Sequence, residues 1–299
     1  MTGRKLDFVL LCNRNTGVID RMTEPTTPFA AVVLAGDRSV GDPMARAAGV
    51  NSKSLIPVGG RPMVLRVLDA LEAAREIEGI ILCGPAKPIV EEEKELRVRI
   101  DSGMVRWMES EATPSSSTYH ALQSLPDSAP VLVTTSDHAL LTAEMVDYFC
   151  AGARQSNKDV VVGLARHESV ITEYPETKRT AIPLADGSYC SCNLFAFLTS
   201  EARTAAHFWR KVESQRKKIL RVIAGFGWLN FLLYLLKRPT LAQGLELISQ
   251  RIGLKAGAVV LPFPEAAVDV DTLRDWKLVE SILTGRAPGE LSSLGEAED

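Results

Sequence analysis

The sequence of 299 residues has few of the features that are typical of zinc-binding, disulfide-rich and nucleic-acid-binding proteins. It contains only four histidines and five cysteines, and Cys190 and Cys192 stand too close together for a usual zinc knuckle. Because the cysteine count is odd and no metal-ligand spacing recurs, reduced thiols of the cytosolic kind are expected. The formal net charge of −3 gives no reason to expect nucleic-acid binding. Zinc modules, disulfide-rich scaffolds and nucleic-acid partners are therefore not expected.

The sequence also shows no pattern typical of a targeting segment or of a membrane-spanning helix. Residues 1–28 have no basic start followed by a long apolar stretch and a small-residue cleavage site, so no signal peptide is expected. They form an N-terminal tail without assigned function, and Met22 is an alternative start of the chain. An apolar run at 222–236 is fifteen residues long, whereas a spanning helix needs about twenty. We expect a cytoplasmic protein.

What the sequence does contain is an alternation of short apolar runs and amphipathic patterns. Runs rich in Val, Ile and Leu predict strands buried on both faces, and apolar residues at three- and four-residue spacing predict helices. The predicted strands lie at 29–36, 78–85, 129–137 and 158–166, and the predicted helices at 62–76 and 142–155. Alternation at this pace predicts an α/β fold, Rossmann-like, with a mixed, mostly parallel sheet flanked by helices. Ligands of such sheets bind beyond the carboxyl ends of the strands.

The loop after the first predicted strand carries the strongest pattern, "LAGDRSVGDPMARAAGVNSKSLIPVGGRP" (34–62). Gly36 allows the backbone to approach a ligand, and consecutive backbone N–H groups can cradle an anion. The loop has neither the Walker pattern nor the dinucleotide fingerprint. Glycines alone also suit an ordinary surface loop, but Lys53 adds a compact positive charge before the turn at Gly59 and Gly60. We therefore predict that the loop binds an anion, and the resemblance described next implies that this anion is a nucleoside triphosphate.

Leu34-Ala35-Gly36 followed by Lys53-x-Leu-x-Pro-Val-Gly-Gly-Arg-Pro-Met resembles the signature of nucleotidyltransferases with the nucleotide-diphospho-sugar transferase fold. That group includes sugar-1-phosphate nucleotidyltransferases, methylerythritol-phosphate cytidylyltransferases and guanylyltransferases of the molybdenum cofactor. The resemblance implies that Leu34, Ala35 and Gly36 wrap the triphosphate and that Lys53 contacts phosphate as a catalytic residue. Asp37 departs from the pattern, since it replaces a second glycine, and a carboxylate beside a triphosphate is unfavourable unless it points away or faces a metal.

Two further segments match the carboxylate positions of the same family. Asp137 ends the strand "VLVTTSD", where the family keeps a magnesium ligand, and "AVDVDT" near the end of the chain is the second such site. Asp269 and Asp271 are expected to alternate along a short strand and to face one side, with Asp269 the better ligand by position. Thr272 would cap the closing helix. The implied cofactor is Mg²⁺; a helix entry decorated with acidic residues is the alternative interpretation.

Weaker matches concern recognition of the base and of the second substrate. The resemblance implies nucleotide contacts from Gly84 at the end of the second strand and from the cluster Ser115, Ser116 and Ser117, for which a helix-capping role is equally compatible. It implies an acceptor contact from Asn193. Arg38 can help to neutralise charge in catalysis.

The segment 201–255 departs from the rest in charge, with eleven Lys or Arg and three Glu, a net +8. We predict a basic, apolar helical insertion here. The run 217–238 fits peripheral contact with the inner membrane face, because basic flanks attract anionic lipid; a buried helix or a homodimer face is the alternative.

The predicted organisation is a nucleotidyltransferase domain over 29–200 and 256–287, this insertion, and a disordered tail at 288–299. The predicted reaction is magnesium-dependent attack of a phosphorylated small-molecule acceptor on a nucleoside triphosphate, with release of pyrophosphate. A nucleotide-sugar-dependent glycosyltransferase and a non-catalytic nucleotide-binding relative are the alternatives.

Overall fold

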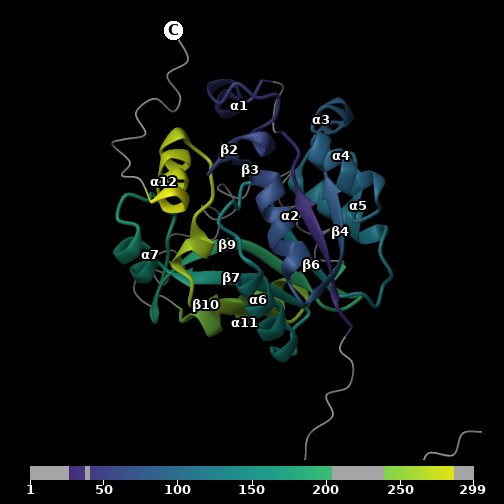
Figure 1. Cartoon of the computed structure of the whole chain (residues 1–299). Coiled ribbons are helices and arrows are strands. Elements are labelled where there is room, and N and C mark those ends of the chain that lie inside the picture. Colours follow the sequence, from purple (N-terminus) through teal and green to yellow (C-terminus); the bar gives the residue numbers. More distant parts are fainter. Residues whose placement is uncertain (1–26, 38–40, 204–238, 286–299) are drawn as a thin grey trace, which may run out of the picture.

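The computed structural model describes residues 27–37, 41–203 and 239–285. Within these residues the chain forms one mixed sheet of eight strands in the order β10-β7-β9-β6-β1-β4-β5, with β8 paired to β9 (Figure 1). Only the pairs made by β9 are antiparallel; the other pairs of this sheet are parallel. The strands are β1 (Phe29–Leu34), β4 (Ile77–Cys83), β5 (Val105–Met108), β6 (Val131–Thr135), β7 (Val160–Arg166), β8 (Ile182–Leu184), β9 (Gly187–Phe197) and β10 (Ala256–Leu261). The predicted α/β class, with a mostly parallel sheet, is confirmed.

Helices cover both faces of this sheet, as buried apolar strands require. Ala31 and Val33 of β1 pack in the cluster that includes Leu68 of α2 (Met63–Ala73) and Met145 of α6 (Ala143–Gln155). Val32 between them faces the other side, where it packs in a cluster with Leu122 of α5 (Pro114–Gln123). The four strands and two helices predicted from the alternating apolar and amphipathic patterns are present. The amphipathic patterns at 62–76 and 142–155 form α2 and α6. Thr142 caps α6, because its side chain accepts a hydrogen bond from Met145 N.

Shorter elements lie around this framework. They are α1 (Pro43–Ala47), the 3-10 turn η1 (Lys53–Leu55), the small hairpin of β2 (Pro57–Val58) and β3 (Arg61–Pro62), α3 (Lys87–Glu92), α4 (Lys94–Asp101), α7 (His167–Glu173), the 3-10 turn η2 (Pro264–Ala267) and the closing helix α12 (Leu273–Thr284). A second apolar cluster joins α12 to Ile56 directly after η1, to Val58 of the hairpin and to the segment 268–270. The C-terminal helix therefore supports the loop that carries Lys53.

The segment before α12 differs from the expected short strand. Residues 268–271 run between η2 and α12 without a strand ladder, because only four residues separate the 3-10 turn from the Thr272 cap. One backbone hydrogen bond of 3.1 Å, from Val270 N to Asp137 O, fixes the segment against the end of β6. The alternation of sides is nevertheless kept, since Val268 and Val270 are buried in the cluster beneath α12.

Of the predicted insertion, the structure describes 201–203 and 239–255. The latter contains α11 (Leu241–Ile252), which begins with a capping box at Thr240 and packs beside β10. The apolar run 222–236 and its basic flanks within 217–238 lie outside the described residues, as do Arg38 and the tail 288–299. Among the helices that are described, none has the length and apolar character needed to cross a membrane.

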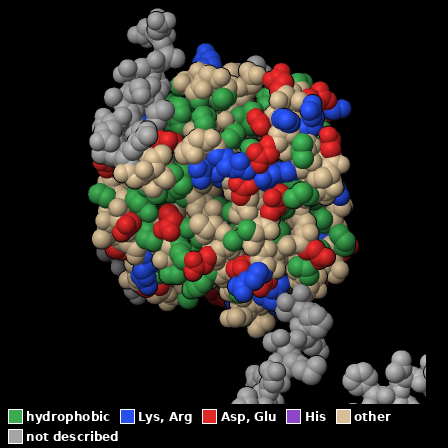
Figure 2. All heavy atoms as spheres, in the orientation of Figure 1, with side chains coloured by type: hydrophobic (Ala, Val, Ile, Leu, Met, Phe, Trp, Pro, Cys, Tyr) green, Lys and Arg blue, Asp and Glu red, His purple; other side chains and the backbone are tan. Residues whose placement is uncertain are grey.

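The visible face over β3, α2 and α4 carries interleaved basic and acidic side chains rather than a patch of one sign (Figure 2). Arg61 contacts Asp69 and Glu95, and Arg99 contacts Asp69, Glu72 and Glu95, at N–O distances of 2.5–3.2 Å. Arg61 is therefore engaged in this ion-pair network.

Candidate active site

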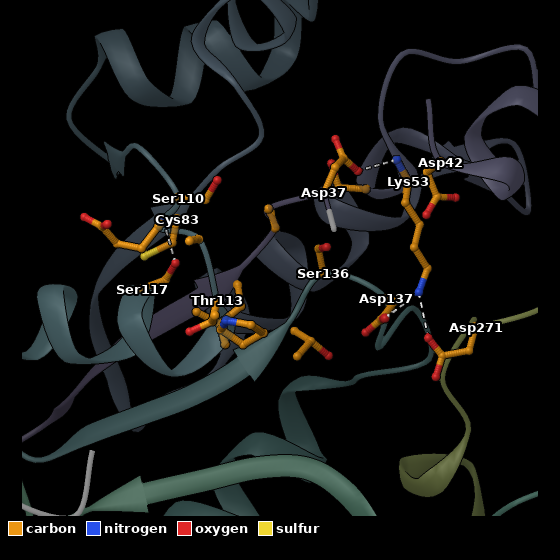
Figure 3. A pocket seen from close by; sticks show the side chains of 18 residues that line it. Asp37, Asp42, Lys53, Cys83, Ser110, Thr113, Ser117, Ser136, Asp137 and Asp271 are labelled. Atoms are coloured by element: carbon orange, nitrogen blue, oxygen red, sulfur yellow. Dashed lines mark hydrogen bonds and ion pairs between the residues drawn. The ribbon is translucent and has the colours of Figure 1, made fainter. Parts of the chain in front are cut away.

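The carboxyl ends of β1, β4 and β6 meet at one edge of the sheet, as parallel strands require, and a cavity of about 220 Å³ opens there (Figure 3). Predicted residues that line it are Leu34, Ala35, Gly36, Lys53, Ser117, Asp137 and Asp271. Further lining side chains that the sequence did not single out come from Asp42, Cys83, Ser110, Thr113 and Ser136. Residues 237 positions apart in the chain thus form one site.

Two glycines bring the strand ends close together. A Cβ on Gly36 would lie 2.7 Å from Ser110 Cβ, so only glycine lets the loop after β1 pass this side chain. Gly84 has φ +84°, and a Cβ there would lie 2.8 Å from the backbone nitrogen of Gly36. Gly84 does not line the cavity. Its position instead lets the ends of β4 and β1 pack in direct contact.

Asp37, the residue that departs from the family pattern, anchors the loop to the Lys53 segment. Its Oδ1 accepts hydrogen bonds from Lys53 N at 3.0 Å and from Ser52 Oγ at 3.1 Å. The side chain of Asp42 likewise contacts the backbone: it caps α1 by accepting a hydrogen bond from Met44 N at 2.8 Å. Both carboxylates are therefore engaged by donors of the loop itself, which accounts for acidic residues in a loop that is predicted to bind an anion.

Lys53 lies between two carboxylates at the centre of the site. Its Nζ is 2.8 Å from Asp137 Oδ2 and 2.8 Å from Asp271 Oδ1, as the dashed lines of Figure 3 show. Burial alone would lower the pKa of Lys53, but the contacts with Asp137 and Asp271 outweigh it and raise this pKa above its ordinary value. The ammonium group is thus charged and joins the end of β6 to the segment before α12.

Asp269 has different partners. Its carboxylate forms an ion pair with Arg179 Nη1, and its Oδ2 accepts hydrogen bonds from Arg179 Nη2 at 3.0 Å and from Asn193 Nδ2 at 2.6 Å. Asn193 reaches it because the β7–β9 register shifts here and Asn193 takes a positive φ of +51°. Asp269 therefore belongs to a second charged cluster beside the first, made by Arg179, Asn193 and Asp269.

These contacts decide which carboxylates suit a divalent cation. Asp137 and Asp271 already hold one positive charge between them, and Asp137 Oδ1 is buried with no hydrogen-bond partner in the described part of the chain. Two carboxylates with phosphate and water as further ligands are what Mg²⁺ prefers. Asp269 is neutralised by Arg179 and is less suited. Asp271, and not Asp269, is thus the carboxylate that shares a cation with Asp137, whereas sequence position favoured Asp269.

The predicted serine cluster begins α5 and divides between two roles. Thr113 caps the helix by accepting from Ser116 N at 3.2 Å, and Ser115 is fully buried near this cap. Ser117 Oγ accepts from Glu111 N at 2.8 Å and lines the cavity. Ser117 and the cap residue Thr113 therefore lie closer to the site than Ser115 and Ser116, which do not line it.

His138 follows Asp137 but is fully enclosed. Burial is the main cause that lowers the pKa of its imidazole, to about 4, so the ring is neutral at physiological pH. His138 does not line the cavity. Arg179, by contrast, went unnoticed in the sequence, because "TKRT" carries no pattern beyond that of a charged loop; only its contact with Asp269 distinguishes it.

Comparison with known proteins identifies the family of this chain. The family model described as the MobA-like NTP transferase domain matches residues 31–256, and the chain belongs to this family of nucleotidyltransferases. A hypothetical transferase from Thermus thermophilus is similar in structure, with a TM-score of 0.68, 30% identity, and coverage of 83% of this chain and 99% of that one.

More distant similarity extends to enzymes named for cytidylyl transfer. A 2-C-methyl-D-erythritol 4-phosphate cytidylyltransferase of Clostridium perfringens is 27% identical over 117 residues, or 39% of this chain; the match spans half the length of that relative. The 4-diphosphocytidyl-2C-methyl-D-erythritol synthase structure from Anaerococcus prevotii has a TM-score of 0.52 at 15% identity, covering 86% of this chain and 96% of that one. The structure of a CMP:2-keto-3-deoxy-manno-octonic acid synthetase complexed with CTP has a TM-score of 0.53 at 10% identity, and the match covers 86% of this chain and 99% of that one. The last two share the fold.

Proposed function

We propose that this protein catalyses Mg²⁺-dependent transfer of a nucleotidyl group from a nucleoside triphosphate to a phosphorylated small-molecule acceptor, with release of pyrophosphate. The observation that carries the proposal is the position of Lys53 between Asp137 and Asp271 at the cavity formed by the ends of β1, β4 and β6. A cation held by two carboxylates beside a glycine-containing loop is suited to a polyphosphate and its metal ion.

Each part of the site has a role in this reaction. The backbone from Leu34 to Gly36 can approach the triphosphate closely, since Gly36 has no side chain to exclude it. Lys53 can turn from the carboxylates to the phosphates and neutralise charge there. Asp137 and Asp271 would hold Mg²⁺, which supplies further charge neutralisation at the α-phosphate when bound. Ser117 and Thr113 lie on the side of the cavity formed by α5, where a base can be contacted.

The chemistry needs little proton transfer. An ionised phosphate oxygen of the acceptor attacks the α-phosphorus, a new P–O bond forms, and the bond to the bridging oxygen breaks as pyrophosphate leaves with its electron pair. No general base is required, which suits a cavity that no histidine of the described residues lines. Catalysis then depends on positioning and on charge stabilisation.

CTP is the first triphosphate to test, because the curated relative matched over part of the chain is named a cytidylyltransferase. The experiment measures thermal stabilisation of the full chain by CTP, GTP, UTP and ATP with and without Mg²⁺, followed by pyrophosphate release with a panel of phosphorylated alcohols and sugars. We expect one triphosphate to stabilise the protein in a Mg²⁺-dependent way and to yield pyrophosphate with an acceptor. Asp137→Asn should abolish that release.

Two outcomes would contradict the proposal. A nucleotide-sugar-dependent glycosyltransferase would bind a nucleoside diphosphate sugar and release no pyrophosphate. A non-catalytic relative would bind a triphosphate and show no turnover with any acceptor, with Asp137→Asn indistinguishable from the wild type. Lys87→Ala, which changes a side chain with 70% exposure, serves as the charge control.

A further inference from the structure

The guanidinium of Arg179 is held in place by Asp269 and keeps N–H donors that this contact does not use. It lies in the connection between α7 and β8 and contacts Asp269 through Nη1 and Nη2. A guanidinium has five N–H donors, so this two-point contact leaves three of them. Its Nε is buried without a hydrogen-bond partner in the described part of the chain, and the side chain retains 16% exposure. The arrangement fixes a cation in place without using up its capacity to bind an anion.

Unsatisfied polar atoms are concentrated at this place. Over the described ranges, all buried side-chain nitrogen and oxygen atoms without a hydrogen-bond partner belong to 134–138, 177–179 and Asp269, and of these the Oδ1 of Asp269 is in an ion pair with Arg179 Nη1. These segments meet, because Asp269 contacts Arg179 and the next residue, Val270, is hydrogen-bonded to Asp137 O. Buried polar groups in folded proteins are normally paired, with protein or with a bound species. Their confinement to one junction indicates that a polar ligand completes it.

The junction lies directly beside the proposed reaction centre. Asp269 and Asp271 alternate with Val268 and Val270, which pack in the apolar cluster beneath α12, so both carboxylates lie on the other side of the segment, with Asp269 itself buried. Asp271 lines the triphosphate cavity, whereas Arg179 and Asp269 do not. In-line displacement requires the attacking oxygen to enter opposite the leaving pyrophosphate. An acceptor held outside the triphosphate cavity, next to Asp271, meets that requirement.

We propose that Arg179 binds the anionic phosphate group of the acceptor, with Asp269 and Asn193 as positioning residues that hold its guanidinium in orientation. This inference rests on the proposed nucleotidyl transfer and names the group that selects a phosphorylated second substrate. Asn193, which the sequence suggested as an acceptor contact, acts through Asp269, since its Nδ2 donates to that carboxylate at 2.6 Å. A charge-assisted fork is well matched to phosphate oxygens.

The test separates binding of the two substrates in the full chain. The first measurement is calorimetric affinity for Mg²⁺ with the triphosphate that stabilises the wild type most. The second is the concentration of inorganic phosphate, used as a probe for the acceptor group, that half-saturates a further rise in melting temperature at saturating triphosphate. For Arg179→Gln we expect triphosphate affinity within about twofold of the wild type and a phosphate half-saturation at least about tenfold higher. Arg166→Gln, which removes a neighbouring surface charge, should leave both unchanged.

A double variant distinguishes binding from mere charge neutralisation. Arg179→Gln alone leaves Asp269 buried without its cation and can destabilise the fold. Arg179→Gln/Asp269→Asn removes both charges, and we expect it to recover stability but not phosphate affinity. Recovery of wild-type phosphate affinity in the double variant would overturn the proposal, as would a wild type that shows no phosphate effect up to about 50 mM. If no triphosphate binds at all, the nucleotidyl-transfer proposal fails, while the phosphate titration of the nucleotide-free protein still tests Arg179.

Discussion

The indole Nε1 of Trp276 donates a hydrogen bond of 2.8 Å to the backbone oxygen of Pro57, which joins the closing helix to the segment that follows Lys53. Trp276 is 3% exposed and packs with Ile56 and Val58 beneath α12. The position of Lys53 therefore depends on a residue more than two hundred positions later in the chain. The turn η1 is only three residues long, so this loop depends on such support from outside it.

Trp276→Phe should accordingly lower stability and loosen the Lys53 loop together. The change leaves Pro57 O without its donor and removes part of the buried side chain, which costs about 1–3 kcal/mol. We expect the free energy of unfolding in urea to fall by this amount and triphosphate affinity to weaken. Unchanged affinity with the expected loss of stability would show that the hydrogen bond supports the fold and not the site.

Lys53→Met should turn the two carboxylates into a site for metal without nucleotide. In the wild type the ammonium already neutralises Asp137 and Asp271, so a divalent cation gains little there before the phosphates arrive. Without it, like charges lie close together and favour a cation strongly. We expect Mn²⁺ to bind the nucleotide-free variant at least about tenfold more tightly, measured by electron paramagnetic resonance. Lys87→Met is the control, and equal Mn²⁺ affinity in all three proteins contradicts this view.

Gly84→Ala should destabilise the junction of β1 and β4. The positive φ costs about 1–3 kcal/mol for a residue with a side chain, and the new Cβ would overlap the backbone of Ala35 and Gly36. Gly103 offers a matched control, because it has φ +78° and nothing within 4 Å of its Cβ position. We expect Gly103→Ala to show the smaller loss in chemical denaturation. Equal losses would mean that backbone strain alone, without close packing, accounts for Gly84.

The thiol of Cys83 should be unreactive although it lines the cavity. Burial is the main cause that raises the pKa of Cys83 to about 12, and its surface is 1% exposed. The thiolate, which is the reactive form, is then about a thousandfold scarcer at pH 8 than for a free cysteine. Peptide mapping after iodoacetamide treatment should find Cys83 unlabelled in the folded protein and labelled in urea. Rapid labelling of folded protein would show that this end of β4 opens to solvent.

Much of the framework could be predicted from local pattern. Buried runs of Val, Ile and Leu become β1, β4, β6 and β7 because such residues must be covered on both faces, and the caps at Thr142 and Thr272 follow from a side-chain oxygen ahead of an amphipathic run. The place of β9 between β6 and β7 could not be predicted in this way. Its antiparallel pairing depends on which edge the returning chain meets, and no residue type specifies that.

The candidate site shows the same division between local and long-range information. The sequence by itself predicted Gly36, Lys53, Asp137, Asp269 and Asp271 as contacts to phosphate or metal, because their residue types and order resemble the nucleotidyltransferase pattern. Only the tertiary structure decided that Asp271 shares Lys53 with Asp137 while Asp269 pairs with Arg179 and Asn193. Ion pairs form between side chains that the fold brings within a few ångströms, and residues 179 and 269 are brought together by the packing of separate elements.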